Sequence, residues 1–166
     1  MAQADFVLAL LRLLKERGIS CALDTSGFAP WKAYADAAPY LDRVLWDVKA
    51  ADDALHRKLT GQSKAPILEN LKRMDETGVD IDIRIPLIPG LNDGEIGAIG
   101  RLLLPLRHVR EVKVLPYHAY SGSLYRALGM PYPLEGHPVP EEEAEKRAVD
   151  TLAKTGLPAV GHRGAS

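Results

Sequence analysis

The 166-residue sequence is short of cysteine, of aromatic residues and of long apolar runs. Its single cysteine, Cys21, excludes a disulfide within the chain and any metal or cluster site that takes several thiolates from this chain. Small and apolar neighbours predict that Cys21 is a buried free thiol. No apolar run reaches the roughly 18 residues of a membrane span, and no basic and apolar leader follows Met1. We therefore expect a cytoplasmic protein without a membrane partner.

The sequence also has no charge excess of either sign. Its 21 Lys and Arg residues nearly balance its 22 Asp and Glu residues, which leaves a formal net charge of -1. A nucleic-acid partner is therefore not predicted. With 46% hydrophobic and 26% charged residues, the composition is that of an ordinary globular chain, and the length corresponds to about one domain.

Apolar periodicity predicts strands that alternate with helices along most of the chain. The expected helices span residues 5–17, 30–38, 52–59, 64–77, 94–106 and 141–155. The expected strands span residues 19–23, 43–48, 79–88 and 109–115. Residues 119–140 are expected to be irregular, and residues 161–166 to be a disordered tail. The alternation predicts an α/β fold with a parallel sheet, namely a partial TIM-like (β/α) half-barrel of four βα units preceded by one helix.

The first predicted helix is strongly apolar. Phe6, Leu10, Leu13 and Leu14 recur at helical spacing and are expected to form its main apolar face, which Val7 and Leu11 widen. No element precedes this helix in the chain to cover that face. The pattern therefore suggests that a segment upstream of Met1 belongs to the fold.

Polar side chains collect where the predicted strands end. They are Asp24, Thr25, Asp47, Lys49, Arg84 and His118. Because the carboxyl ends of parallel strands share one edge of a sheet, we expect a small-molecule site there. Arg84 interrupts an apolar alternation and is expected to face the barrel interior, where it needs an acid or an anion as partner. The whole set suits a ligand that is zwitterionic or carries a carboxylate.

Each of these residues also has an ordinary structural explanation. Asp24 or Thr25 alone could cap the next helix. Lys49 alone could be a surface lysine, and His118 alone a hydrogen-bonded structural histidine. The sequence shows no nucleophile with an adjacent base and no phosphate loop of the GxxxxGKS or GxxxxGKT type. An aldolase-like or isomerase-like TIM fragment, with Lys49 forming a Schiff base, stays open as an alternative.

Five short strings follow one another along the chain. They are LDTSG at 23–27, DVK at 47–49, HRKLTG at 56–61, IPLIPGLND at 85–93 and LPYH at 115–118, followed by Tyr125 and Leu128-Gly129. In this order and spacing, over residues 5 to 160, the chain resembles the glycyl-radical-enzyme activating enzymes. The pyruvate formate-lyase activating enzyme is the type member of this family, which belongs to the radical SAM enzymes.

The resemblance implies a fold and a chemistry. The family folds as a (β/α)6 partial barrel, of which residues 1–160 are expected to be the C-terminal part. A CxxxCxxC loop holds a [4Fe-4S] cluster, and the cluster cleaves S-adenosylmethionine to a radical that takes a hydrogen atom from a glycine of the partner. That partner is a glycyl radical enzyme such as pyruvate formate-lyase.

The resemblance also implies roles for single residues. The expected contacts of S-adenosylmethionine are Asp24, Lys49, Arg84 and His118. The expected ligands of a monovalent cation beside the methionyl carboxylate are Asp24, Thr25, Asp47 and the Leu45 carbonyl. A cation there would offset the acids that would otherwise repel the carboxylate.

The chain departs from the family in two motifs. It has neither the CxxxCxxC loop nor the GGEP motif of the family, and both are expected upstream of Met1. The chain alone is therefore expected to be an inactive fragment of an activase, which holds the cluster only in the complete protein. Two non-catalytic alternatives are a half-barrel that self-associates through its open edge and one that pairs with a separately encoded cluster-binding half.

Overall fold

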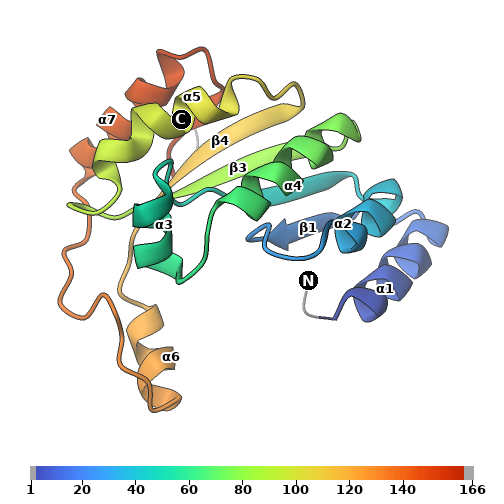
Figure 1. Ribbon diagram of the computed structural model, residues 1–166, viewed down its shortest axis with the longest axis horizontal. Coiled ribbons are helices and arrows are strands. Elements are labelled where there is room, and N and C mark those ends of the chain that lie inside the picture. Colours follow the sequence, from blue (N-terminus) through green and yellow to red (C-terminus); the bar gives the residue numbers. More distant parts are fainter. Residues whose placement is uncertain (1–2, 163–166) are drawn as a thin grey trace.

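Five parallel strands lie in chain order across one sheet in the computed structural model of the protein, which describes residues 3–162. The strands are β1 (Ala22–Thr25), β2 (Arg43–Asp47), β3 (Asp80–Leu87), β4 (Val109–Pro116) and β5 (Ala159–Val160). The α-helices are α1 (Ala4–Glu16), α2 (Trp31–Ala37), α3 (Asp53–Thr60), α4 (Ala65–Glu76), α5 (Ile96–Leu103), α6 (Ser121–Ala127) and α7 (Glu142–Ala153). Short 3-10 helices are η1 (Ala38–Tyr40) and η2 (Asp93–Glu95). The predicted α/β class with a parallel sheet is confirmed (Figure 1).

One face of the sheet is the core. Helices α2, α4, α5 and α7 pack on this face, and its central strand residues are fully buried. These strand residues are Val44, Trp46, Ile81, Ile83, Ile85, Val112 and Val114. Because side chains alternate along a strand, the residues between them occupy the opposite, inner face. That inner face carries Asp24, Asp47, Asp82, Arg84, Glu111 and Lys113.

The first strand begins three residues later than predicted, at Ala22 instead of position 19. Asp42 explains the shift. Its carboxylate accepts a hydrogen bond from the Cys21 N–H at 2.8 Å, and its own N–H donates to the Cys21 carbonyl at 2.9 Å. Cys21 is thus held by the segment before β2, and regular pairing starts with Ala22 opposite Arg43. The prediction of a buried free thiol at Cys21 is confirmed.

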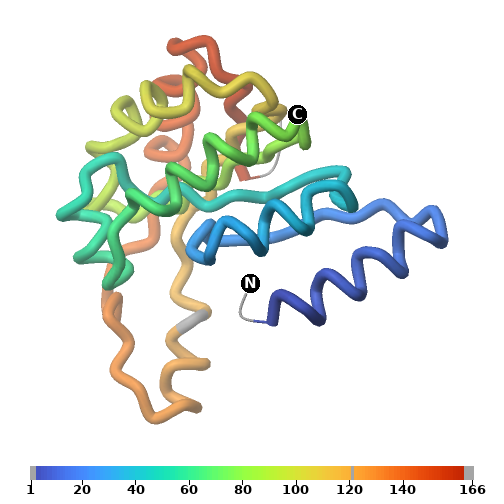
Figure 2. The backbone as a smooth tube through the Cα atoms, turned by 45° about the vertical axis from the view of Figure 1, so that its right-hand side comes forward, coloured from blue at the N-terminus to red at the C-terminus, as the bar shows by residue number. Residues whose placement is uncertain are grey.

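Two elements were not predicted. The sheet has a fifth strand, β5, whose two residues pair with Val112 and Lys113 and are too few to show a periodicity. Helix α6 lies inside the segment 119–140, which was expected to be irregular. Figures 1 and 2 show this segment as an arm that projects away from the sheet. Of the predicted tail, residues 163–166 lie outside the described residues.

Helix α1 buries only one side of the predicted apolar stripe. The residues that pack against the core are Val7 and Leu11, which were expected only to widen the stripe, and Leu14 of the expected main face. The exposed residues are Phe6 (64%), Leu10 (41%) and Leu13 (44%). Both stripes have helical spacing, so periodicity alone does not select between them. No helix among the described residues is long and apolar enough to cross a membrane.

Candidate functional site

The carboxyl ends of β1 and β2 and the middle of β3 bring four charged side chains into one cluster. Arg84, which was expected at a strand end, lies three residues before β3 ends and opposite Asp47. The Arg84 guanidinium pairs with both oxygens of Asp24, one of them at 2.8 Å from Nη1, and its Nε donates to Asp47 Oδ1 at 3.0 Å. Lys49 Nζ donates to the second oxygen of Asp47 at 3.2 Å. Asp24, Asp47, Arg84 and Lys49 therefore form a chain of alternating charges, which we call the strand-end cluster.

The electrostatics of the strand-end cluster favour its charged state. Burial lowers the pKa of Arg84, but hydrogen bonds and charges from Asp24 and Asp47 outweigh it, so the pKa of Arg84 lies above its ordinary value. The Arg84 side chain is 21% exposed, whereas that of Asp24 is 65% exposed. The cluster thus presents an accessible carboxylate beside guanidinium and ammonium groups.

Thr25 and Leu45 lie beside the cluster, but the Thr25 side chain points to the other face of the sheet. The Thr25 hydroxyl is 2.9 Å from the Tyr34 hydroxyl and accepts a hydrogen bond from the Gly27 N–H at 3.0 Å. Leu45 is opposite Asp24 in the register of β1 and β2. Among residues 3–162, no three or more His, Cys, Asp or Glu side chains are grouped to hold a metal ion.

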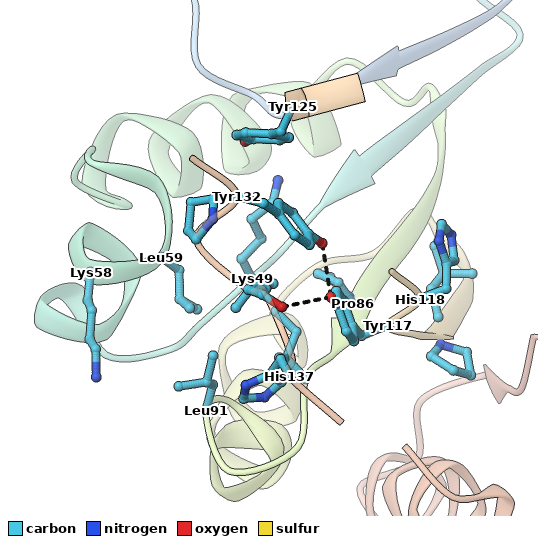
Figure 3. A pocket seen from close by; sticks show the side chains of 15 residues that line it. Lys49, Lys58, Leu59, Pro86, Leu91, Tyr117, His118, Tyr125, Tyr132 and His137 are labelled. Carbon is cyan, nitrogen blue, oxygen red and sulfur yellow. Dashed lines mark hydrogen bonds between the residues drawn. The ribbon is translucent and has the colours of Figure 1, made fainter. Parts of the chain in front are cut away.

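His118 lies apart from the strand-end cluster. It follows β4, and its ring centroid is 4.5 Å from that of Tyr120. His118 and Lys49 nevertheless line the same pocket, which has a volume of about 580 Å³. Lys49 therefore belongs both to the cluster and to the pocket. Figure 3 shows the Lys49 side chain extending toward Tyr132, with His118 on the far side of Tyr117.

Three of the residues that line the pocket are tyrosines that were not predicted as site residues. Tyr132 donates a hydrogen bond to the Tyr117 hydroxyl at 3.0 Å, and Tyr117 donates to the Leu134 carbonyl at 3.3 Å (Figure 3). The Tyr125 ring lies 5.1 Å from the Tyr132 ring. Burial and the neighbouring Tyr117 raise the pKa of Tyr132 to about 12, so its hydroxyl stays protonated at neutral pH.

One sequence signal could have indicated that tyrosines line the pocket. Four of the six tyrosines of the chain fall between residues 117 and 132, within or next to a segment without regular periodicity. Tyrosine combines an apolar ring with a polar tip, which suits the wall of a pocket open to water. The segment 119–140 was expected to be irregular and rich in Gly, Pro and Tyr, but its tyrosines were not interpreted as site residues.

Comparison with known families identifies the class of protein to which the chain belongs. Residues 1–103 match the Radical SAM superfamily, and the chain belongs to this superfamily. Its curated relatives are named as activating enzymes. The chain is 38% identical over 158 residues to the isethionate sulfite-lyase activating enzyme of Nitratidesulfovibrio vulgaris, covering 93% of this chain and 50% of the relative. It is 34% identical over 159 residues to the pyruvate formate-lyase 2-activating enzyme of Escherichia coli, covering 95% and 54%.

A solved structure agrees with these relatives. A crystallised domain of a pyruvate-formate lyase-activating enzyme from Bacteroides vulgatus superposes with a TM-score of 0.81 at 26% identity. The match covers 96% of this chain and 91% of that domain. The resemblance to activating enzymes that the motifs indicated is therefore confirmed. The chain spans about half the length of the first curated relatives it matches.

The superfamily implies two bound groups, S-adenosylmethionine and a [4Fe-4S] cluster, and the residues of this chain fit only the first. S-adenosylmethionine carries an α-ammonium and an α-carboxylate, which complement the exposed carboxylate and the cations of the strand-end cluster. A [4Fe-4S] cluster does not fit this chain. Its one cysteine is buried, and the Cys21 thiol donates to the Ile19 carbonyl at 3.4 Å. Three cluster thiolates would have to come from elsewhere.

Proposed function

We propose that this chain is the part of a radical SAM activating enzyme that binds the methionyl end of S-adenosylmethionine. The observation that carries the proposal is the strand-end cluster, which places opposite charges at the carboxyl ends of β1 and β2 and on the adjacent part of β3. This is the edge at which α/β folds bind their ligands. When bound and reduced, S-adenosylmethionine supplies the hydrogen-atom abstraction of radical SAM chemistry.

Each charged residue has a proposed part in binding. The exposed Asp24 carboxylate accepts hydrogen bonds from the α-ammonium, and Lys49 and Arg84 bind the α-carboxylate. His118, on the same pocket as Lys49, contacts the ribose or adenine end. Because Arg84 and Lys49 together balance Asp24 and Asp47, the ligand carboxylate approaches a cluster that is not negative overall.

A monovalent cation is proposed to enter only when Arg84 moves. The oxygens of Asp24 and Asp47 that would coordinate it are hydrogen-bonded to Arg84, so the cation and the guanidinium compete for the same acids. The Leu45 carbonyl is the further proposed ligand, whereas Thr25 is proposed to contribute only through its backbone, because its side chain points to the other face of the sheet. Sodium NMR relaxation tests this competition. Arg84→Gln is expected to bind sodium more tightly than the wild type, and equal binding would contradict the proposal.

The [4Fe-4S] cluster is proposed to be held by cysteines outside this chain. With a single thiol, the chain cannot supply three thiolates. Anaerobic incubation of the chain with iron, sulfide, reductant and S-adenosylmethionine is expected to give no cluster absorbance and no 5′-deoxyadenosine. Cleavage of S-adenosylmethionine by the chain alone would overturn this part of the proposal.

The protein partner is proposed to be a glycyl radical enzyme in the cytoplasm. Support comes from the relatives, which are named for the lyases that they activate. A second candidate function, association with another polypeptide without catalysis, is favoured by two features: the exposed Phe6, Leu10 and Leu13 of α1, and the position of β1 at one end of the sheet. Sedimentation velocity distinguishes a monomer from a self-associated half-barrel.

Calorimetric titration with S-adenosylmethionine tests the proposed binding role. Lys49→Met removes the ammonium at the junction of cluster and pocket, and it is expected to weaken binding about tenfold, the order of one charge-assisted contact. Lys72→Met, at an exposed position of α4, is the matched control and should bind as the wild type does. Equal affinity of the two variants would contradict the proposal.

A further inference from the structure

Asn92 is the most completely buried polar residue near the strand-end cluster, with no exposed surface. It lies between β3 and α5, in the string IPLIPGLND, and the proposed function assigns it no part. Its Oδ1 accepts a hydrogen bond from the Ile88 N–H at 2.8 Å. Its Nδ2 donates to the Lys49 carbonyl at 2.9 Å and to the Pro86 carbonyl at 2.6 Å. All the hydrogen-bonding groups of this side chain are therefore used.

These bonds connect the segments that follow two different strands. The Lys49 carbonyl belongs to the segment after β2, while Pro86 and Ile88 belong to the end of β3 and the turn that follows. Glu95 adds a second link, because its Oε2 accepts hydrogen bonds from the Ala51 N–H at 2.9 Å and the Asp52 N–H at 2.6 Å. The backbone from residue 49 to 52 is thus held by side chains from the loop after β3.

We infer that Asn92 is a positioning residue for Lys49, setting where its ammonium lies between Asp47 and the pocket. The inference rests on the proposed role of Lys49 in ligand binding. The lysine side chain is flexible, so its useful position depends on a backbone that does not shift. Asn92 holds that backbone at the Lys49 carbonyl itself, two residues from the Asp47 carboxylate that pairs with the ammonium.

Asn92→Asp is the substitution that tests this inference most directly. An aspartate keeps the shape and the acceptor for the Ile88 N–H, but it places a carboxylate oxygen against two buried carbonyls that lose their donor. The Lys49 carbonyl is expected to move away, and the Lys49 ammonium to leave Asp47. Asn92→Ala removes the same donors without adding a charge and is the second variant, in case the aspartate prevents folding.

Competitive acetylation, measured by mass spectrometry, reports the position of the Lys49 amine without any ligand. The rate at Lys49 is divided by that at Lys72, an exposed residue of α4. In Asn92→Asp or Asn92→Ala the ratio is expected to rise about threefold, the order expected for loss of a partly exposed ion pair. An unchanged ratio in a folded variant would overturn the inference.

Asn70→Asp is the matched control. Asn70 is also buried, and its Nδ2 likewise donates to two loop carbonyls, those of Gly27 at 3.0 Å and Ala29 at 2.9 Å. This variant should lose thermal stability to a similar extent while the Lys49 to Lys72 ratio stays at the wild-type value. A rise in the ratio for Asn70→Asp as well would show a general loosening of the fold instead of a specific link.

A double-mutant cycle connects the position of Lys49 to binding. Asn92→Asp is expected to weaken S-adenosylmethionine binding about fivefold in the wild type and to change nothing further in the Lys49→Met background. Equal weakening in both backgrounds would assign Asn92 a merely structural role. Absence of binding by the wild type contradicts the proposed function, whereas the acetylation ratio still decides the positioning role, so the two failures are distinguishable.

Discussion

At the scale of single residues, Asp53 shows how one surface carboxylate can hold a loop. It accepts hydrogen bonds from the Ser63 hydroxyl at 2.7 Å, the Lys64 N–H at 2.9 Å and Arg57 Nε at 2.8 Å. These donors stabilise the charged form and lower the pKa of Asp53 from 3.8 to about 2. The carboxylate therefore links α3 to the start of α4.

The lowered pKa predicts a pH dependence of stability. Because the folded-state pKa lies below the unfolded value, ionised Asp53 stabilises the fold above about pH 4, and this contribution disappears as the pH falls toward 2. Asp53→Asn should therefore be less stable than the wild type at pH 7, with a smaller difference near pH 3, as measured by urea unfolding. Asp150→Asn, at an exposed position of α7, is the control. A difference that does not depend on pH would contradict the assigned pKa.

Gly27, the last residue of LDTSG, is required by packing and by backbone conformation. Its φ is +78°, and a Cβ there would lie 2.5 Å from Trp46 Cζ2 and 2.8 Å from Ile67 Cγ2. Gly27→Ala is expected to cost at least about 2 kcal/mol, from overpacking and from the left-handed backbone. The free energy of unfolding in denaturant measures this cost.

Gly78→Ala separates the two contributions. Gly78 has a similar φ of +81°, but no atom lies within 4 Å of the position that a Cβ would take there. This variant should therefore lose only the backbone contribution, about 1 kcal/mol. Equal losses for Gly27→Ala and Gly78→Ala would show that the close approach to Trp46 carries no cost.

At the scale of elements, α1 has two apolar stripes, and the core covers one of them. Leu11 is 6% exposed, whereas Leu10 is 41% exposed. Leu11→Ala is expected to lower the free energy of unfolding by about 2 to 4 kcal/mol, because it leaves a cavity. Leu10→Ala should change it by less than about 1 kcal/mol. If Leu10→Ala were the more damaging change, α1 would pack through its other face.

The order of elements could be predicted from sequence because it depends on local patterns. The alternation in β3 and the turn residues after each strand are visible without knowledge of the fold. The choice between the two stripes of α1 is a tertiary choice, and both stripes have the same period. Helix α6 was missed because Gly122 and two serines weaken its helix propensity, and β5 because two residues show no period.

The sequence predicted the charged residues of the strand-end cluster but not how their side chains pair. The rule that parallel strands end at one edge brought Asp24, Asp47, Lys49 and Arg84 together in advance. It did not predict that Arg84 would pair with both Asp24 and Asp47, because this pairing depends on side-chain geometry across three strands. It also missed Asn92, because its partners include the carbonyl of a residue 43 positions away and no local pattern records that contact.

At the scale of the whole molecule, the sheet has one covered and one charged face. The helices bury the apolar face, while the inner face carries the strand-end cluster together with Asp82, Glu111 and Lys113. A domain of almost the same extent from Bacteroides vulgatus has been crystallised. The fold thus presents a candidate ligand-binding edge, and the thiolates of the [4Fe-4S] cluster are proposed to lie outside the chain.

The central claim is that the strand-end cluster binds S-adenosylmethionine. The most direct measurement is a titration of the isotopically labelled chain with S-adenosylmethionine, followed through its backbone amide NMR signals. We predict saturable shifts at residues 24–27, 47–49, 84 and 85, with a dissociation constant of roughly 1 mM or tighter, and binding about tenfold weaker in Asp24→Asn and Lys49→Met. An absence of shifts, or shifts confined to α1 or α7, would contradict the account.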